Sequence, residues 1–379
     1  MFFDLSEEQR IMRESVKRFA EKRIKPTQED NEKKGIFCRE IVSEMGELGF
    51  FGGLIPEKYG GSNVGYLSSI IIQEEIARIS ASYAGHFMSQ MAGPALIILK
   101  RGSAAQKERY IQGLLKGDLI GCFASTEPDA GSDVASMRMT ATKQGNTFIL
   151  EGVKSWITNA TVADVGLIFT YTDKGKKHHG ISCFIVELKN TPGISTSKIE
   201  KLGLNCSVVG EITFRGVKIS GDSILGNEGE GFKILMEMLG NTRLFAAGRA
   251  LGVGRACLEE SIKYAKERQQ FGQPIGQFQM VQNQLAEMCI EHEASKMLVY
   301  QAAINKDKGI DDPVEVAIAK YFACKSATKA ADTAMEIFSS YGFSMEYPIQ
   351  RYVRDSRAFN LTEGTSNIQK VIIARKLIS

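Results

Sequence analysis

Four short segments of the 379-residue chain bring side chains that could do chemistry next to turn-forming residues. They are residues 126–133 (TEPDAGSD), 154–159 (KSWITN), 267–275 (ERQQFGQPI) and 363–369 (EGTSNIQ). Their residue types suit, in turn, phosphate binding, stacking on a flat ring, clamping of a diphosphate and removal of a proton. Each segment also has an ordinary structural interpretation, so none of them identifies a function alone.

The first two segments offer contacts to a phosphate or a flat heterocycle. Residues 126–133 follow the strand-like run GCFAS, and small residues at a strand end leave backbone N–H groups that can hold a phosphate or a polar ring edge. A turn that closes a hairpin explains the same residues. The chain's one tryptophan, Trp156, stands near the hydroxyls of Ser155 and Thr158 and could face a planar ring; a core tryptophan is the alternative.

The other two segments offer a cation and an acid. Arg268 ends a strongly periodic run, where it could clamp a diphosphate through paired hydrogen bonds or simply lie near the negative end of a helix dipole. Glu363 is followed by Gly364 and Thr365 at the start of another helical run. It could act as a base or as a charge partner of the helix N-terminus.

Composition argues against several classes of function. With 47 basic and 44 acidic residues and only short basic runs, the chain shows no nucleic-acid-binding surface. Seven cysteines without a CxxC pair and four histidines without a ligand spacing disfavour a disulfide framework and a metal site. No signal-peptide pattern and no run of about 20 apolar residues is found. The expectation is a cytoplasmic protein without metal, nucleic acid or membrane span.

Hydrophobic periodicity divides the chain into three parts. We predict an α+β protein with an N-terminal α-helical domain over residues 1–118, a middle domain of antiparallel strands over 119–228 and a C-terminal helical bundle over 229–379. Ser6 and Gln9 have the spacing of a capping box at the first helix. Clefts form preferentially where domains meet, so a ligand is expected at these junctions.

In their order and spacing the four segments resemble the acyl-CoA dehydrogenase family. The resemblance covers nearly the whole chain, from LSEEQR through PEKYGG, TEPDAGSD, KSWITNA, YAKERQQFGQPI and EYPIQRYVRD to EGTSNIQKVIIAR. It implies bound FAD, an acyl-CoA substrate, an electron-transfer flavoprotein as acceptor and a homo-oligomer, either a dimer or a tetramer. The implied reaction is α,β-dehydrogenation to the trans-2-enoyl-CoA, in which a base removes the α-proton and the β-hydride passes to flavin N5.

The resemblance also assigns roles to matching positions. Glu363 would be the base, with Arg243 beside it. The flavin ring would be held by Phe123, Ser125, Thr126, Trp156, Ile157 and Thr158. The FAD of a neighbouring subunit would be reached by Arg268, Phe271 and Gln279, while Thr365 and Asn367 would close over the adenosine. Substrate contacts would come from Ser132, Asn241, Thr242, Arg243 and Gly364, with Ser132 at either the diphosphate or the pantetheine arm.

Three positions depart from the pattern. Thr242 stands where some relatives carry the base on an earlier helix, which leaves Glu363 as the base. Glu336 replaces a glutamine that contacts FAD in many members, so that contact is not predicted here. Ala84 stands where glutaryl-CoA dehydrogenases carry an arginine for the distal carboxylate. Because a buried carboxylate without a partner is costly, we expect an acyl chain that is uncharged at its far end, unless a protonated His86 supplies the charge.

Other activities fit the same scaffold. They are an enoyl-thioester reductase, an oxidase or dehydrogenase acting on a carrier-protein-bound acyl thioester, and a non-catalytic thioester binder. The binder is least favoured, because Glu363, Arg243, Trp156 and Thr158 are all present. The length and branching of the acyl chain stay open, because single methylenes contribute only about 1–3 kcal/mol of discrimination.

Overall fold

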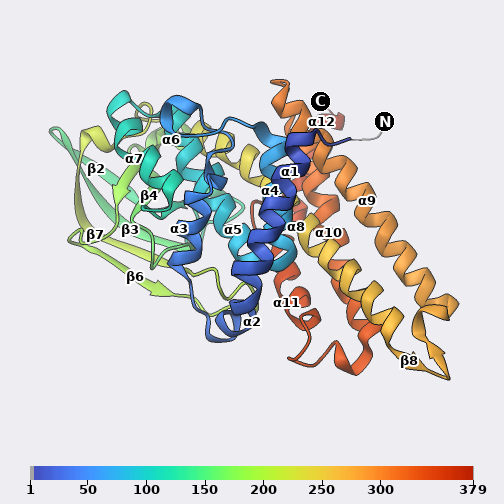
Figure 1. The fold of residues 1–379 in the computed structure, drawn as a ribbon. Helices are drawn as coiled ribbons and strands as arrows, with labels where there is room; N and C mark the ends of the chain where they lie inside the picture. The colour runs from blue at the N-terminus through green and yellow to red at the C-terminus, as the bar shows by residue number, and fades with distance from the viewer. Residues whose placement is uncertain (1–3, 379) are drawn as a thin grey trace.

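The computed structural model describes residues 4–378, in which a mixed sheet stands beside two groups of helices (Figure 1). The helices before the sheet are α1 (Glu7–Phe19), α2 (Lys25–Lys34), α3 (Arg39–Glu47), α4 (Gly65–Ile79), α5 (Ala81–Gln90), α6 (Leu96–Arg101) and α7 (Ala104–Lys116). Helix α1 begins at the predicted capping box. Ser6 Oγ accepts from Gln9 N at 3.2 Å and Gln9 Oε1 accepts from Ser6 N at 3.1 Å, which satisfies two N–H groups that the helix leaves free.

The sheet follows as β1 (Gly121–Ala124), β2 (Thr140–Gln144), β3 (Thr147–Thr158), β4 (Val165–Tyr171), β5 (Ile181–Glu187), β6 (Ile194–Lys198) and β7 (Val209–Ser220). The α+β class is confirmed, with most strand pairs antiparallel. However, β1 runs parallel to β4, and β2 touches β4 in parallel at Thr140. The sheet is therefore mixed, because runs of strand-forming residues specify neither strand order nor direction.

A bulge near the end of β3 turns the tryptophan out of the sheet. Lys154 pairs with Ile212 and Ile157 pairs with Gly210, so two residues of β3 lie opposite one residue of β7. Such a bulge redirects side chains locally. Trp156 sits there with φ of 59°, a left-handed conformation that is unusual for a bulky residue.

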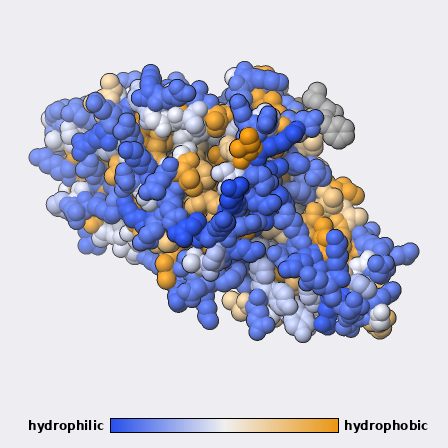
Figure 2. Space-filling model, viewed as in Figure 1, coloured by the Kyte–Doolittle hydropathy of each residue, from blue (hydrophilic) through white to orange (hydrophobic). Residues whose placement is uncertain are grey.

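Helices α8 (Gly231–Glu267), α9 (Gln279–Asp307), α10 (Pro313–Phe338), α11 (Ile349–Phe359) and α12 (Ser366–Ile378) complete the chain. At 37 residues, α8 is about 55 Å long and packs against α4, α9 and α10. Gly252 permits the close approach to α4, since a Cβ there would lie 2.3 Å from the carbonyl oxygen of Glu74. Figure 2 shows apolar side chains gathered over α9, where Ile290 and Met297 are exposed.

Two buried carboxylates join the three parts of the chain. Glu32 on α2 accepts hydrogen bonds from the backbone N–H groups of Asn205 and Cys206, at 2.8 and 3.1 Å. Asp355 on α11 accepts one from Leu204 at 2.6 Å. Three successive N–H groups of a loop before β7 are therefore bound by acids from both helical groups, which fixes the sheet between them.

Asp355→Asn is expected to remove part of the pH dependence of stability. Burial, and next the charge of Glu32, raise the pKa of Asp355 from its ordinary 3.8 to about 7, against the opposing charge of Arg351. The folded chain therefore binds more protons than the unfolded chain between these values. Protonation of Asp355 therefore stabilises the folded chain. The contribution to the free energy of unfolding is complete below about pH 4 and is lost as pH rises through about 7, by up to about 1.4 kcal/mol per pH unit.

The measurement is the thermal unfolding midpoint across this pH range for the wild type and the variant. Asp332→Asn is the matched control, because Asp332 is half-exposed and its ion pair with Arg357, at 2.6 Å, lies on the surface. The control should keep the wild-type slope while Asp355→Asn flattens it. Identical slopes for all three proteins would contradict the assignment.

Candidate functional site

Glu363 lies in the loop between α11 and α12 in a conformation that the surrounding side chains hold. Its φ is 55°, and that of Gly364 is 82°. A left-handed conformation costs energy for a residue other than glycine and occurs often at functional sites. Arg243 Nε donates to the carbonyl oxygen of Glu363 at 3.2 Å. Lys320 Nζ and Gln369 Nε2 donate to that of Gly364 at 2.9 and 2.8 Å, so the loop is fixed from three sides.

The carboxylate of Glu363 turns toward α8. Thr242 Oγ1 donates a hydrogen bond of 2.5 Å to Glu363 Oε2. Consecutive residues of α8 thus bind the side chain and the backbone of Glu363. The structure therefore brings together Glu363, Gly364, Thr242 and Arg243, which sequence reasoning placed in one site.

Buried cations surround this carboxylate. Burial lowers the pKa of Arg243, and the charge of Glu363 opposes that shift. Burial likewise lowers the pKa of Lys320 on α10 and of Arg249 on α8, and again the charge of Glu363 opposes the change. Sequence reasoning missed Lys320 and Arg249, because each lies in a helical run without a motif. Positive groups in a desolvated site favour negative charge that develops on a bound molecule.

A second cluster forms where the end of β1 meets the bulge of β3. Ser155 N donates to the carbonyl oxygen of Thr126 at 2.9 Å, and Lys154 Nζ donates to that of Ser125 at 3.2 Å. These contacts hold two predicted segments side by side. They gather the predicted residues Phe123, Ser125, Thr126, Trp156, Ile157 and Thr158.

This cluster fits a flat, polar-edged ring such as a flavin. Trp156 is 60% exposed, so its ring is free to contact a ligand. Ile157 is buried in the core and pairs with Gly210 of β7, so its side chain does not face the surface of the cluster. Phe123 and Thr158 are half-buried at the strand ends. The exposed ring of Trp156 therefore lies beside backbone groups at the ends of β1 and β3.

An ion pair beneath this cluster was not foreseen. Lys154 Nζ donates to Glu127 Oε1 at 2.7 Å, and both side chains are buried. Burial lowers the pKa of Lys154 to about 8, although the charge of Glu127 opposes this. Glu127 also accepts from the backbone N–H groups of Arg138 and Met139. Within the TEPDAGSD segment, Glu127 therefore holds the loop, while Ser132 lies exposed.

The predicted FAD contacts of the third segment lie at the tip of the helical bundle. Phe271 and Gly272 have φ of 49° and 79°, as a two-residue hairpin turn requires, between β8 (Gln269–Gln270) and β9 (Gln273–Pro274). Phe271 is 93% exposed, and the guanidinium of Arg268 lies 5.3 Å from the ring centroid of Tyr341. Figure 1 shows β8 at the far end of the bundle from the sheet. The structure therefore does not bring Arg268, Phe271 and Gln279 near Trp156 of the same chain.

The remaining predicted residues have local partners. Asn241 is buried, and its side-chain oxygen accepts from Tyr66 at 2.8 Å. Thr365 Oγ1 accepts from Ile368 N at 3.3 Å at the start of α12, and Asn367 is exposed there. Glu336, which was not assigned to FAD, accepts from Gln284 Nε2 at 3.0 Å.

His86 on α5 lies buried beside Asn159. Its side chain is buried, and Nδ1 lies 3.2 Å from Asn159 Oδ1. Burial lowers the pKa of His86 to about 4, although the hydrogen bond to Asn159 opposes the shift. Burial therefore disfavours the protonated imidazole that the rescue of a distal carboxylate by His86 would need.

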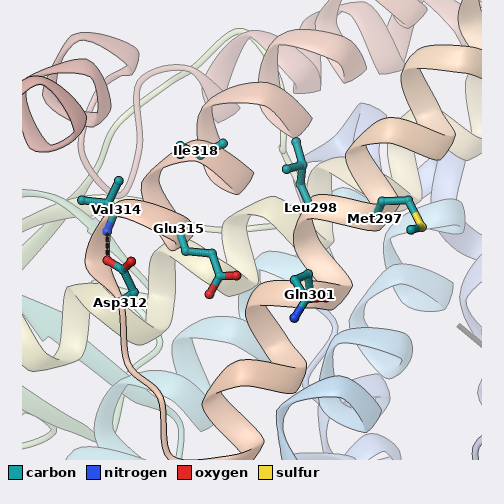
Figure 3. A pocket seen from close by; sticks show the side chains of 7 residues that line it. All are labelled: Met297, Leu298, Gln301, Asp312, Val314, Glu315 and Ile318. Atoms are coloured by element: carbon teal, nitrogen blue, oxygen red, sulfur yellow. Dashed lines mark hydrogen bonds between the residues drawn. The ribbon is translucent and has the colours of Figure 1, made fainter. Parts of the chain in front are cut away.

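A pocket of about 390 Å³ between α9 and α10 lies apart from both clusters (Figure 3). Its lining residues are Met297, Leu298, Gln301, Asp312, Val314, Glu315 and Ile318. Asp312 caps α10 by accepting from Val314 N at 2.8 Å. None of the predicted site residues lines this pocket. Within residues 4–378 no group of His, Cys, Asp and Glu is arranged to hold a metal ion, and no described helix is both long and apolar enough to cross a membrane.

Comparison with known proteins covers the chain from end to end. Family profiles for the N-terminal, middle and C-terminal domains of acyl-CoA dehydrogenase match residues 6–118, 122–217 and 229–378. The glutaryl-CoA dehydrogenase of Desulfococcus multivorans is 44% identical over 379 residues, which cover 99% of this chain and 97% of that protein. The short-chain specific acyl-CoA dehydrogenase of Megasphaera elsdenii is 38% identical over 383 residues, with 100% of both chains covered.

Solved structures show the same arrangement. A glutaryl-coenzyme A dehydrogenase in complex with glutaryl-CoA superposes with a TM-score of 0.98 at 43% identity, covering 100% of this chain and 97% of the other. A chain from a structure described as the electron transferring flavoprotein of Acidaminococcus fermentans gives 0.97 at 37% identity, with 100% of both chains covered.

Proposed function

Because the chain belongs to the acyl-CoA dehydrogenase family of FAD-dependent oxidoreductases that act on CH–CH bonds, we propose that Glu363 removes the α-proton of a short acyl-CoA thioester. The observation that carries this proposal is the carboxylate of Glu363, bound by Thr242 and held in a strained loop by Arg243. The product is the trans-2-enoyl-CoA.

The proton and the electrons leave the substrate by separate routes. The proton on Cα passes to the carboxylate of Glu363, which must lie within hydrogen-bond reach of it. Bound FAD supplies the acceptor for the hydrogen and two electrons that leave Cβ. Within the described residues, the backbone N–H of Glu363 donates no hydrogen bond, so it can donate to the thioester carbonyl as enolate charge develops.

The residues proposed to hold FAD come from two places. Phe123, Ser125, Thr126, Trp156, Ile157 and Thr158 provide the ring-binding cluster of one chain. Arg268, Phe271 and Gln279 belong to the β8 end of the bundle, far from that cluster in the same chain, and the ring of Phe271 is exposed there. A homo-oligomer in which this hairpin reaches the neighbour's FAD accounts for both facts. Thr365 and Asn367, at the start of α12, are proposed to contact the adenosine.

The acyl-CoA substrate is proposed to contact the residues around Glu363. Thr242 and Arg243 bind Glu363, Gly364 follows it in the chain, and Asn241 precedes Thr242 on α8. Ser132 is proposed to meet the pantetheine or diphosphate from the exposed loop. An electron-transfer flavoprotein is the proposed acceptor; the shared fold with a chain from the Acidaminococcus fermentans structure supports it. The relatives' names include glutaryl-CoA and short-chain dehydrogenases, so a small acyl group is favoured.

Anaerobic reduction by acyl thioesters tests the reaction directly. The purified holoenzyme is expected to lose its visible flavin absorption within seconds when mixed with a short acyl-CoA, and to regain it with an electron-transfer flavoprotein faster than with air. Flavin bleaching by carrier-protein thioesters but not by CoA thioesters would instead indicate a dehydrogenase or oxidase that acts on carrier-protein-bound acyl groups. No bleaching by any saturated thioester, with turnover of enoyl-CoA in the presence of reductant, would replace the proposal with a reductase.

A further inference from the structure

We propose that His86 is a positioning residue for the flavin site: through the side chain of Asn159 it holds β1 and the end of β3, where the ring-binding residues are proposed to lie. This inference rests on the flavin-binding cluster of the proposed function and adds to it a residue of α5. The role needs a hydrogen-bond donor at His86 and no positive charge.

The side chain of Asn159 joins α5, β1 and β3. Asn159 directly follows Thr158, the last residue of β3, and it is fully buried. Its Nδ2 donates to the carbonyl oxygen of Gly121 at 2.9 Å, and its backbone N–H donates to that of Val208 at 2.7 Å. Because Nδ2 is bound to Gly121, the atom that faces His86 is Oδ1. An amide oxygen only accepts, so Nδ1 of His86 carries the hydrogen of this 3.2 Å contact.

His86 has one polar contact among residues 4–378, and it is directed to Asn159. The imidazole lies between two aromatic rings, with ring centroids 5.2 Å from that of Phe37 and 6.2 Å from that of Phe51. Its Nε2 has no hydrogen-bond partner among the described residues. No other described group donates to Oδ1 of Asn159. Loss of the imidazole would therefore leave a buried amide oxygen without its donor, which is unfavourable.

A second residue of α5 binds the same strand. Gln90 lies one helical turn after His86 on the same face of α5, and its Oε1 accepts from Gly121 N at 2.9 Å. The N–H of Gly121 is therefore bound by Gln90 directly, while its carbonyl oxygen is bound to His86 through Asn159. Strand β1 has only four residues, so a shift of Gly121 carries its other end, Ala124, with it.

The helical turn that follows α5 contacts the flavin-binding cluster itself. The π-helical turn Met91–Ala95 is interrupted at Gly93, which has φ of −87° and ψ of −111°. A Cβ at Gly93 would lie 3.1 Å from Cδ1 of Phe123, one of the proposed ring-binding residues. The chain around α5 therefore reaches β1 and the end of β3 at three places, through His86, Gln90 and Gly93.

The anchored segment is the one that the proposed reaction needs in a fixed place. Asn159 follows Thr158 directly and lies three residues after Trp156. A misplacement of about 1 Å at a reacting group can lower a rate by about 10²-fold. Loss of the hydrogen bond from His86 is therefore expected to change the surroundings of the bound ring, and not only the stability of the fold.

Four variants separate the hydrogen bond from packing. In asparagine, as in histidine, the donor nitrogen is bonded to Cγ, so His86→Asn can keep the contact with Asn159, whereas His86→Leu cannot. Both variants leave part of the ring's volume empty. Asn159→Gly removes the acceptor without backbone strain, because φ of residue 159 is 68°, which glycine adopts readily. His292→Leu is the matched control, since His292 is a half-buried histidine of α9 in the helical bundle.

Three quantities are measured: the visible absorption spectrum of the bound flavin, the dissociation constant of FAD from titration of the apoprotein, and the rate of anaerobic flavin reduction by butyryl-CoA. His86→Leu is expected to shift the absorption band, to weaken FAD binding about tenfold and to slow reduction about tenfold. His86→Asn and His292→Leu should keep the wild-type spectrum and stay within about threefold in both other quantities. Asn159→Gly should lose at least as much as His86→Leu, and adding His86→Leu to it should change little more, since both remove the same contact.

Two results with His86→Leu would overturn the inference. If it lowered only the unfolding midpoint and kept the spectrum and the FAD affinity of the wild type, His86 would be a packing residue. Equal losses in His86→Leu and His86→Asn would show that the hydrogen bond is not the cause. If His86→Leu does not fold, Asn159→Gly decides, and a wild-type spectrum and FAD affinity in that variant would contradict the role. The spectrum and the FAD titration need no thioester, so failure of every saturated thioester to bleach the flavin would end the proposed dehydrogenation without deciding the role of His86.

Discussion

Glu363→Gln is expected to keep the fold and the bound FAD but to lose flavin reduction by an acyl-CoA by at least about 10²–10⁴-fold. Glutamine has nearly the same shape and can still accept from Thr242 Oγ1, which now bonds Glu363 Oε2 at 2.5 Å. It cannot take up a proton from Cα. The contacts of Arg243, Lys320 and Gln369 with the backbone carbonyls of the loop do not depend on the side chain, so the loop should stay in place.

The measurement is the rate of anaerobic flavin bleaching in a stopped-flow experiment at saturating substrate. Glu228→Gln is the matched control, because Glu228 is an exposed acid that pairs with Lys143 on the sheet. Thr242→Val separates positioning from proton transfer: it keeps the acid but removes its hydrogen bond, so it should reduce the rate far less than Glu363→Gln does. Near-normal bleaching by Glu363→Gln would rule out this residue as the base.

The sequence was sufficient for the order of helices and strands, because the hydrophobic period changes from helical to alternating and back. The capping box of Ser6 and Gln9 is a local signal of the same kind, and it is confirmed. The parallel pairing of β1 with β4 was not predicted, because the residues of a strand do not specify which strand it pairs with or in which direction.

The residues of the candidate site also fall into two groups, those that stand in sequence motifs and those that do not. Residues in compact motifs, such as Glu363 and Trp156, could be proposed for the site because several unusual residue types stand together in the sequence. Lys320 and Arg249 were missed, since each is a single cation in an otherwise ordinary helix and its role depends on distant residues. The interpretation of Ala84 depends on a single position of α5, so an acyl chain that is uncharged at its far end stays a prediction.

Lys154→Met is expected to destabilise the fold by about 3–5 kcal/mol and to weaken FAD retention, because it leaves a buried acid without its partner. Lys154 is fully buried, and its Nζ lies 2.7 Å from Glu127 Oε1 and 3.2 Å from the carbonyl oxygen of Ser125. The same ammonium group therefore neutralises Glu127 and holds the end of β1 against the bulge that carries Trp156. Loss of both contacts should loosen the proposed flavin-binding cluster.

Unfolding in denaturant and the FAD content after gel filtration measure these two effects. Lys143→Met is the matched control: Lys143 pairs with Glu228 at 2.9 Å on the surface of the same sheet, where such a pair contributes at most about 1 kcal/mol. Adding Glu127→Leu to Lys154→Met should recover much of the stability, since no buried charge is then left unpaired. FAD retention should stay low in that double variant, because Ser125 still lacks the donor from Lys154. If Lys154→Met proved as stable as Lys143→Met and kept its FAD, the buried pair would support neither the sheet nor the cofactor site.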